Sequence, residues 1–114
     1  MIAVIFEVEP ATAHRDAYLD IAAKLKPELE KIDGFISVER FQSISNPAKM
    51  LSLSFFRDEA AVKQWRNLEN HRRAQQVGRD GIFANYRLRV ASILRDYGMT
   101  ERQEAPSDSI AVHG

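Results

Sequence analysis

Apolar side chains occupy every second position at the start of the chain. They are Ile2, Val4, Phe6 and Val8, and they alternate with Ala3, Ile5, Glu7 and Glu9. A period of two residues is typical of a β-strand, because successive side chains of a strand point to opposite faces. We therefore expect a strand with one fully apolar face that ends at Pro10.

The next segment changes to a helical period. Apolar positions recur at steps of three and four residues, at Tyr18, Ile21, Ala22, Leu25, Leu29 and Ile32. This spacing predicts a helix with one buried stripe, and Thr12 can cap its start. Pro27 lies inside the pattern and predicts a kink or a restart near Lys26, because proline lacks a backbone N–H. Asp33 and Gly34 should end the helix, since glycine tolerates a left-handed conformation.

Two further alternating segments are separated by a short turn. They read "GFISVERFQS" at residues 34–43 and "MLSLSFFR" at residues 50–57, and the pair Asn46-Pro47 between them is typical of a turn. The short connection predicts an antiparallel hairpin.

A second helix and a last strand complete the order of elements. Asp58 precedes "EAAVKQW", where its carboxylate can accept backbone N–H groups and complement the helix dipole. "YRLRVASILRDY" at residues 86–97 alternates again and predicts a long strand. The order βαββαβ favours an α+β, ferredoxin-like fold, with a four-stranded antiparallel sheet and both helices on one face.

Residues 99–114 lose all periodicity. We expect them to form a flexible tail after a single domain at residues 1–98, with "SIAV" able to add a short strand. A length of 114 residues with 45% hydrophobic content suits one compact domain.

The predicted sheet has a second face that the two helices leave uncovered. Apolar residues stand on both faces of most strands, as in Phe35 beside Ile36 and Phe55 beside Phe56. An open apolar sheet favours a partner sheet packed against it, and a two-fold homodimer is the usual arrangement. Alternatively, this face is solvated, because polar residues dilute it. Those residues are Ser37, Glu39, Ser52 and Ser54.

Charge and cysteine content narrow the classes of function. The chain has no cysteine, which excludes disulfides and cysteine nucleophiles and suits the cytoplasm. The first residues lack the basic region of a signal peptide, and no segment is long enough to span a membrane. Net charge is zero, although residues 63–97 hold eight Lys or Arg against three Asp or Glu. This surplus could attract an anionic ligand, but we expect no nucleic-acid partner.

The segment "WRNLENHRRAQQVGR", residues 65–79, concentrates the candidate chemistry. Trp65 could pack in the core or form the wall of a pocket. His71 is suited to accept a proton near neutral pH, or it could be a surface or capping residue. Arg72 could bind an anionic group, and Asn67 could contact a substrate carbonyl, although both types are often solvated.

Aromatic residues on the strands could line a pocket for a flat ligand, or they could simply fill the core. The candidates for substrate contact are Phe6, Phe56 and Tyr86. The three histidines are too dispersed to indicate a metal site, so we expect no metal.

Residues 1–97 resemble the antibiotic biosynthesis monooxygenases of the dimeric α/β-barrel superfamily. The likeness is carried by "DGFISVERFQS", by "LSLSFFRDEAAVKQWRN", and by "HRRAQQVGR" leading to "YRLRVASILRDYG". The resemblance implies a dimeric barrel of two ferredoxin-like sheets, with one pocket per subunit between sheet and helices. It also implies oxidation of an aromatic or quinol-type substrate by O2 without a cofactor, for which His71 would accept the substrate proton.

The same resemblance leaves two other functions open. A non-catalytic ligand-binding or stress-related protein can share the scaffold. Haem-degrading relatives resemble one another in an Asn on the first strand and in a His about ten residues after the helix Trp. Here the first strand has no Asn, and His71 follows Trp65 after only six residues, which argues against haem.

Overall fold

The alternation at the start of the chain produces the first strand, β1, which spans Ile2–Pro10. The structure is a computed structural model, and it describes residues 1–68 and 81–114. The further elements of the sheet domain are η1 (Thr12–His14), α1 (Arg15–Glu30), β2 (Phe35–Gln42), β3 (Met50–Phe56), α2 (Glu59–Asn67) and β4 (Phe83–Ser92).

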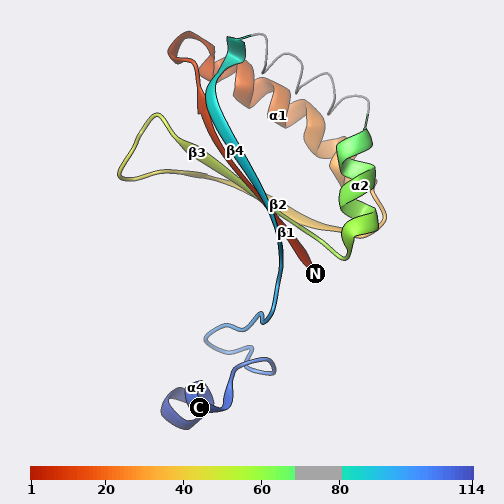
Figure 1. The fold of residues 1–114 in the computed structure, drawn as a ribbon, viewed down its shortest axis with the longest axis vertical. Helices are drawn as coiled ribbons and strands as arrows, with labels where there is room; N and C mark the ends of the chain where they lie inside the picture. Colours follow the sequence, from red (N-terminus) through yellow and green to blue (C-terminus); the bar gives the residue numbers. More distant parts are fainter. Residues whose placement is uncertain (69–80) are drawn as a thin grey trace.

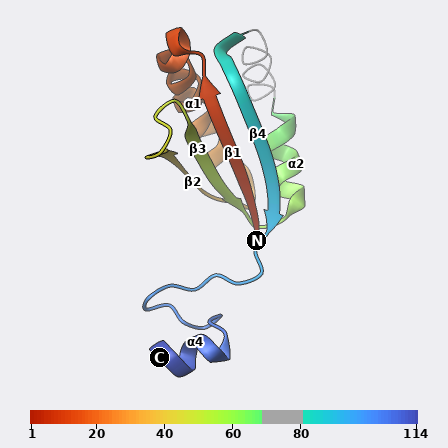
Figure 2. The same cartoon turned by 60° about the vertical axis from the view of Figure 1, so that its left-hand side comes forward.

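The four strands form one antiparallel sheet in the order β2-β3-β1-β4. Helices α1 and α2 lie on the same face of this sheet, and the other face is left uncovered (Figures 1 and 2). The predicted α+β, ferredoxin-like fold is therefore confirmed. The two central strands are β3 and β1. The apolar face of β1, with Val4 and Val8, lies under the helices.

The core lies between the sheet and the helices, in two clusters of buried side chains. The larger cluster joins the sheet to both helices and contains Val4, Leu29, Ile32, Phe56, Ala61 and Val62. The smaller one lies towards the other end of β1 and contains Val8, Tyr18 and Met50. Burial of this apolar area is the main force that holds the helices against the sheet.

The first helix differs from the prediction at its start and at its proline. Thr12 does not cap it, because residues 12–14 form a separate 3-10 turn and α1 begins at Arg15 without a side-chain cap. Helix α1 also continues through Pro27 rather than restarting near Lys26. Pro27 and Ala23, the residue whose carbonyl loses its partner, are both exposed, so the unpaired carbonyl faces solvent.

Two predicted end signals are confirmed. Gly34 follows α1 with a φ of 94°, a conformation that favours glycine. The carboxylate of Asp58 accepts a hydrogen bond of 2.9 Å from the backbone N–H of Ala61 and caps α2.

The last part of the chain departs from the prediction. Strand β4 begins at Phe83 and ends at Ser92, so it starts and stops earlier than residues 86–97. The segment "SIAV" forms no strand, since it lies within helix α4 at Ser107–His113. The chain after β4 leaves the sheet, so "SIAV" has no strand edge to pair with (Figure 1).

The register of the sheet corrects one expectation about its open face. Ser54 is paired with Val4 and Val38, and residues directly opposite in neighbouring strands share a face. Ser52 and Ser54 therefore lie under the helices and do not dilute the open face. The open side of β3 is instead fully apolar and consists of Leu51, Leu53 and Phe55.

Candidate substrate pocket between the sheet and the first helix

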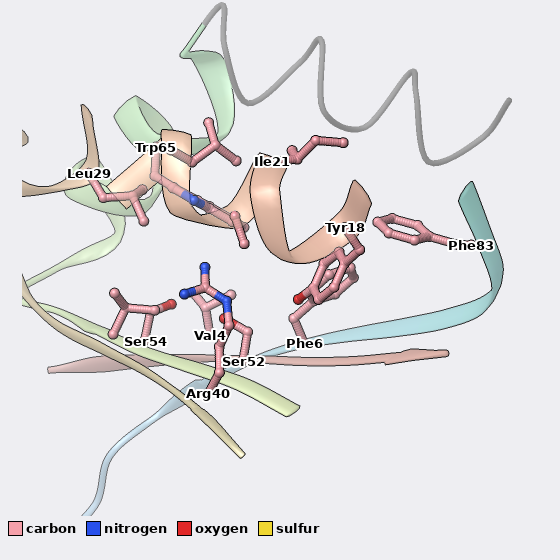
Figure 3. A pocket seen from close by; sticks show the side chains of 13 residues that line it. Val4, Phe6, Tyr18, Ile21, Leu29, Arg40, Ser52, Ser54, Trp65 and Phe83 are labelled. Carbon is pink, nitrogen blue, oxygen red and sulfur yellow. The ribbon is translucent and has the colours of Figure 1, made fainter. Parts of the chain in front are cut away.

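A cavity of about 90 Å³ lies between α1 and the sheet (Figure 3). A single water molecule needs only about 10–15 Å³ of such space, so the cavity can admit a larger group. Helix α1 contributes Tyr18, Ile21, Ala22, Leu25 and Leu29. The sheet contributes Val4, Phe6, Val38, Arg40, Ser52 and Ser54, and Trp65 and Phe83 complete the wall.

Two small side chains on β3 explain why a cavity exists at this position. The helix-facing side of β3 carries Met50 and Phe56 at its ends, both buried, and Ser52 and Ser54 between them. The two serines occupy much less volume than their neighbours, so the space above them is not filled. They also bring hydroxyl groups to the floor of a mostly apolar cavity.

Arg40 introduces a positive charge into this apolar setting. It lies on the edge strand β2 directly opposite Ser52, and its side chain points from the strand towards α1 (Figure 3). The Nε–H of Arg40 is buried and has no hydrogen-bond acceptor in the described part of the chain. Nor does an ion pair join Arg40 to any carboxylate within residues 1–68 and 81–114.

Tyr18 stands beside Arg40 on the helix side of the cavity. Its side chain is buried, with 5% of its surface exposed. Burial raises the pKa of the Tyr18 phenol, and the neighbouring Arg40 guanidinium partly offsets this rise through its charge and its N–H groups. Tyr18 therefore stays a neutral phenol at physiological pH and offers the cavity one polar oxygen.

Aromatic side chains form two walls of the cavity. Trp65 projects from α2 over the sheet, with its ring centroid 6.0 Å from that of Phe56 (Figure 3). At the other end, Phe83 contacts Tyr18, Phe6 and Tyr86 with centroid distances of 5.6, 5.9 and 5.9 Å. These edge-to-face contacts fix the rings and give the cavity a defined shape.

The structure brings together some of the predicted substrate contacts and separates others. Trp65 and Phe6 line the cavity, whereas Phe56 is completely buried beneath Trp65. Tyr86 contacts the ring of Phe6 at 5.8 Å but does not line the cavity.

Three other predicted residues lie away from the described cavity wall. Asn67 is exposed at the end of α2 and does not line the cavity. His71 and Arg72 lie outside the residues that the structure describes, so their assigned roles stay predictions.

Sequence reasoning missed Arg40, Tyr18 and the two serines as pocket residues. Tyr18 was part of the predicted buried stripe, with no sign that its hydroxyl would meet a cavity. The alternation in "ISVERFQ" did place Arg40 on the same face as Val38. A positively charged residue on the same strand face as an apolar core residue could have indicated that Arg40 points into the core.

In the described ranges, no three His, Asp or Glu side chains gather where they could hold a metal ion. Among the helices of the described chain, none has the length and apolar character needed to cross a membrane.

The protein is therefore an α+β protein of the ferredoxin-like class, with a pocket between its sheet and its first helix. The model of the antibiotic biosynthesis monooxygenase family matches residues 1–77, and the chain belongs to this family. It is 50% identical over 93 residues to a protein of Pyricularia oryzae named jasmonate monooxygenase. That match covers 82% of this chain but only 43% of the relative, so the chain spans less than half of the relative's length.

Solved structures share the fold at low sequence identity. Rv0793 from Mycobacterium tuberculosis superposes with a TM-score of 0.76 at 15% identity, over 85% of this chain and 98% of its own. A Deinococcus radiodurans protein, proposed to be an antibiotic biosynthesis monooxygenase, has a TM-score of 0.77 at 10% identity. The latter match covers 86% of this chain and 97% of that one. These likenesses establish the fold and carry no information on the substrate.

Proposed function

We propose that this protein is a monooxygenase that oxidises a small, largely apolar organic molecule with O2 in the pocket under α1. The observation that carries the proposal is the pocket itself. Its wall is apolar and aromatic, and a few polar groups converge on it, as is typical of sites for small ligands. Membership of a family named for monooxygenases and the 50% identical relative support the same reaction class.

A phenolic or quinol-type substrate allows this reaction without a resident cofactor. Removal of a proton makes the ring an electron-rich anion, which can pass electrons to O2. When a phenol becomes a quinone, one oxygen atom enters the ring and the other leaves as water together with the two hydrogens removed. The atoms and electrons balance with no external reductant. We assign the removal of the proton to His71, as the sequence predicts.

The identity to the Pyricularia oryzae protein favours a second kind of substrate, resembling jasmonate. Jasmonate has no phenol to supply electrons. Insertion of one oxygen atom into one of its C–H bonds, with release of water, consumes two further electrons and two protons. This reaction therefore requires an external two-electron donor, such as a reduced nicotinamide, and that requirement separates it from the phenolic reaction.

Oxygen uptake by the purified protein tests these proposals. The substrates are hydroquinones, anthrones and jasmonate, each measured with and without a reduced nicotinamide. We expect uptake that depends on protein and substrate, and a loss of about 100-fold or more in His71→Ala. His14→Ala, which changes an exposed residue of η1, is the control and should keep its activity.

Two outcomes of this test would redirect the assignment. Undiminished turnover in His71→Ala would remove the base role. Ligand binding without oxygen uptake for every substrate would assign the protein to the non-catalytic binding class.

We also propose that the protein is a homodimer formed by its open sheet faces. The sheet face opposite the helices carries Leu51, Leu53 and Phe55 on β3, with Ile5 directly opposite Leu53. A second copy packed against this face would remove the apolar side chains from water, and two-fold pairing is the usual solution. On the same face Glu7 accepts contacts from Arg89 at 3.2 Å and Lys49 at 4.0 Å, so its charge is already paired.

A further inference from the structure

The position of Arg40 is unfavourable for an empty pocket. A guanidinium among apolar side chains loses hydration, and a buried donor without an acceptor adds a further cost. Its Nε–H is in this situation. The hydroxyl groups that share the cavity, on Ser52, Ser54 and Tyr18, are uncharged at physiological pH and cannot neutralise it.

Acidic residues of the described chain do not neutralise Arg40 either. Glu39 precedes it on β2 and therefore points to the opposite face of the sheet. Glu7 also lies on that open face, where Lys49 and Arg89 already pair with it. The cavity is thus lined by a cation that has no counter-charge from the described residues.

We propose that Arg40 binds the carboxylate of the substrate, which is a small monocarboxylate with an apolar body. A carboxylate can accept two parallel N–H bonds from a guanidinium, and the guanidinium of Arg40 lines the cavity and points towards α1 (Figure 3). One cation in an apolar wall fits a single negative charge and not a phosphate or a dicarboxylate. The apolar body would lie against Ile21, Leu25 and Trp65.

This inference rests on the proposed function only in taking the same pocket as the substrate site. It fixes the end of the substrate that is anchored, and hence which end is turned away from Arg40 towards the remaining wall. The carboxylate anchor predicts that an acid binds more tightly than its neutral ester. The oxygenase reaction by itself does not predict this difference in affinity.

Trp65 provides a direct readout of binding. It is the only tryptophan of the chain and lines the cavity, so its fluorescence reports occupancy without any turnover. The probes are jasmonate and 4-phenylbutyrate, each paired with its uncharged methyl ester. We expect each acid to bind about tenfold or more tightly than its ester, because the ester cannot form the charge-assisted pair.

Substitution of Arg40 tests the assignment of the anchor. Arg40→Gln should weaken binding of the acids about tenfold or more and leave the esters within about threefold. Arg40→Lys should fall between, since it keeps the charge but not the planar fork. Arg66→Gln removes the same charge from an exposed position on α2 that does not line the cavity, and it should bind like the parent protein.

Several results would overturn the inference. They are equal affinity for acids and esters, no effect of Arg40→Gln on the acids, and no binding of either acid. Retained discrimination with no oxygen uptake would support the carboxylate anchor and remove the monooxygenase assignment. Oxygen uptake from neutral phenols that is unaffected in Arg40→Gln, together with equal affinity for acids and esters, would support the monooxygenase assignment and remove the carboxylate anchor.

Discussion

Arg40 on β2 and Ser52 on β3 stand directly opposite each other in the sheet, and both side chains face α1. The next pair on this face, Val38 and Ser54, repeats the arrangement with an apolar partner. Two small hydroxyl residues thus open a space in the core, and one cation reaches into it. This relationship is the basis for our proposal that the region binds a ligand.

Filling the space should abolish binding without unfolding the protein. Ser52→Leu places a larger apolar side chain in the cavity, so we expect loss of ligand-dependent Trp65 fluorescence change and of turnover by about tenfold or more. The melting temperature should stay constant or rise, because a void is filled. Thermal denaturation followed by circular dichroism checks the fold of the variant.

Ser43→Leu is a suitable control for that substitution, since Ser43 lies just beyond β2 and outside the cavity wall. Full activity in Ser52→Leu would show that the ligand binds elsewhere.

Arg40 should reduce the stability of the empty protein. Arg40→Met replaces a charge in an apolar site by an apolar side chain of similar length, and such replacements are often neutral or stabilising. We expect the melting temperature to rise by a few degrees while binding of acids is lost. A clear decrease in melting temperature would instead make Arg40 a structural residue.

Gly34 should be intolerant of a side chain. Its φ of 94° is unfavourable for other residues, and an added Cβ would lie 3.0 Å from the Cβ of Ala61 on α2. Gly34→Ala should lower the free energy of unfolding by about 1–3 kcal/mol in urea denaturation. Gly98→Ala is the matched control, because nothing lies within 4 Å of a Cβ there, and it should be nearly neutral.

The carboxylate that caps α2 should make the stability of the folded protein depend on pH. The backbone N–H of Ala61 and then the Arg57 guanidinium hold the pKa of Asp58 below its ordinary value, and Arg57 similarly lowers the pKa of Asp33. A carboxyl group with a lowered pKa in the folded state stabilises the protein above its unfolded pKa, and this contribution is lost as pH falls through the folded pKa.

Asp58→Asn keeps a capping oxygen but removes the charge. It should melt below the parent protein at pH 7, and the difference should shrink below about pH 4. Asp20→Asn, in an exposed pair with Lys24, should change the melting temperature little at either pH. A difference for Asp58→Asn that does not depend on pH would show that its charge contributes nothing.

The open sheet face should determine the oligomeric state. The chain mass is 13.0 kDa, and we expect sedimentation at micromolar concentration to give twice this mass. Leu53→Asp puts a charge in the centre of the apolar patch and should yield monomers. Thr12→Asp, outside the sheet, should leave the dimer intact. A parent protein that sediments as a monomer would contradict the proposed interface.

The fold was predictable because several independent signals agreed. Strand alternation, the helical period around Tyr18 to Ile32 and the caps at Gly34 and Asp58 each describe local structure, and the order of elements then restricts the topology. The strand predicted within "SIAV" was wrong because a short apolar run becomes a strand only beside a free edge, and none lies near it.

The pocket was less predictable, because it depends on which face each strand turns inward. In "MLSLSFF" both sets of alternate residues are partly apolar, so the sequence did not show that Ser52 and Ser54 face the helices. Pairing with Phe6 and Val4 on β1 settles this point. Arg40 was missed for a different reason. The alternation placed it on the face of Val38, but a charged residue on an edge strand is usually turned to solvent.

Oxygen gas labelled with the heavy isotope gives the most direct test of the central claim, that the pocket under α1 is a monooxygenase site. The protein is incubated with labelled O2, the phenolic substrates and jasmonate, with a reduced nicotinamide for the latter, and the products are weighed by mass spectrometry. We predict one labelled oxygen atom in the product, and about tenfold less of this product, or lower still, from Ser52→Leu in the same time. Product oxygen that comes from water, or labelled product formed by Ser52→Leu as fast as by the parent protein, would contradict the account.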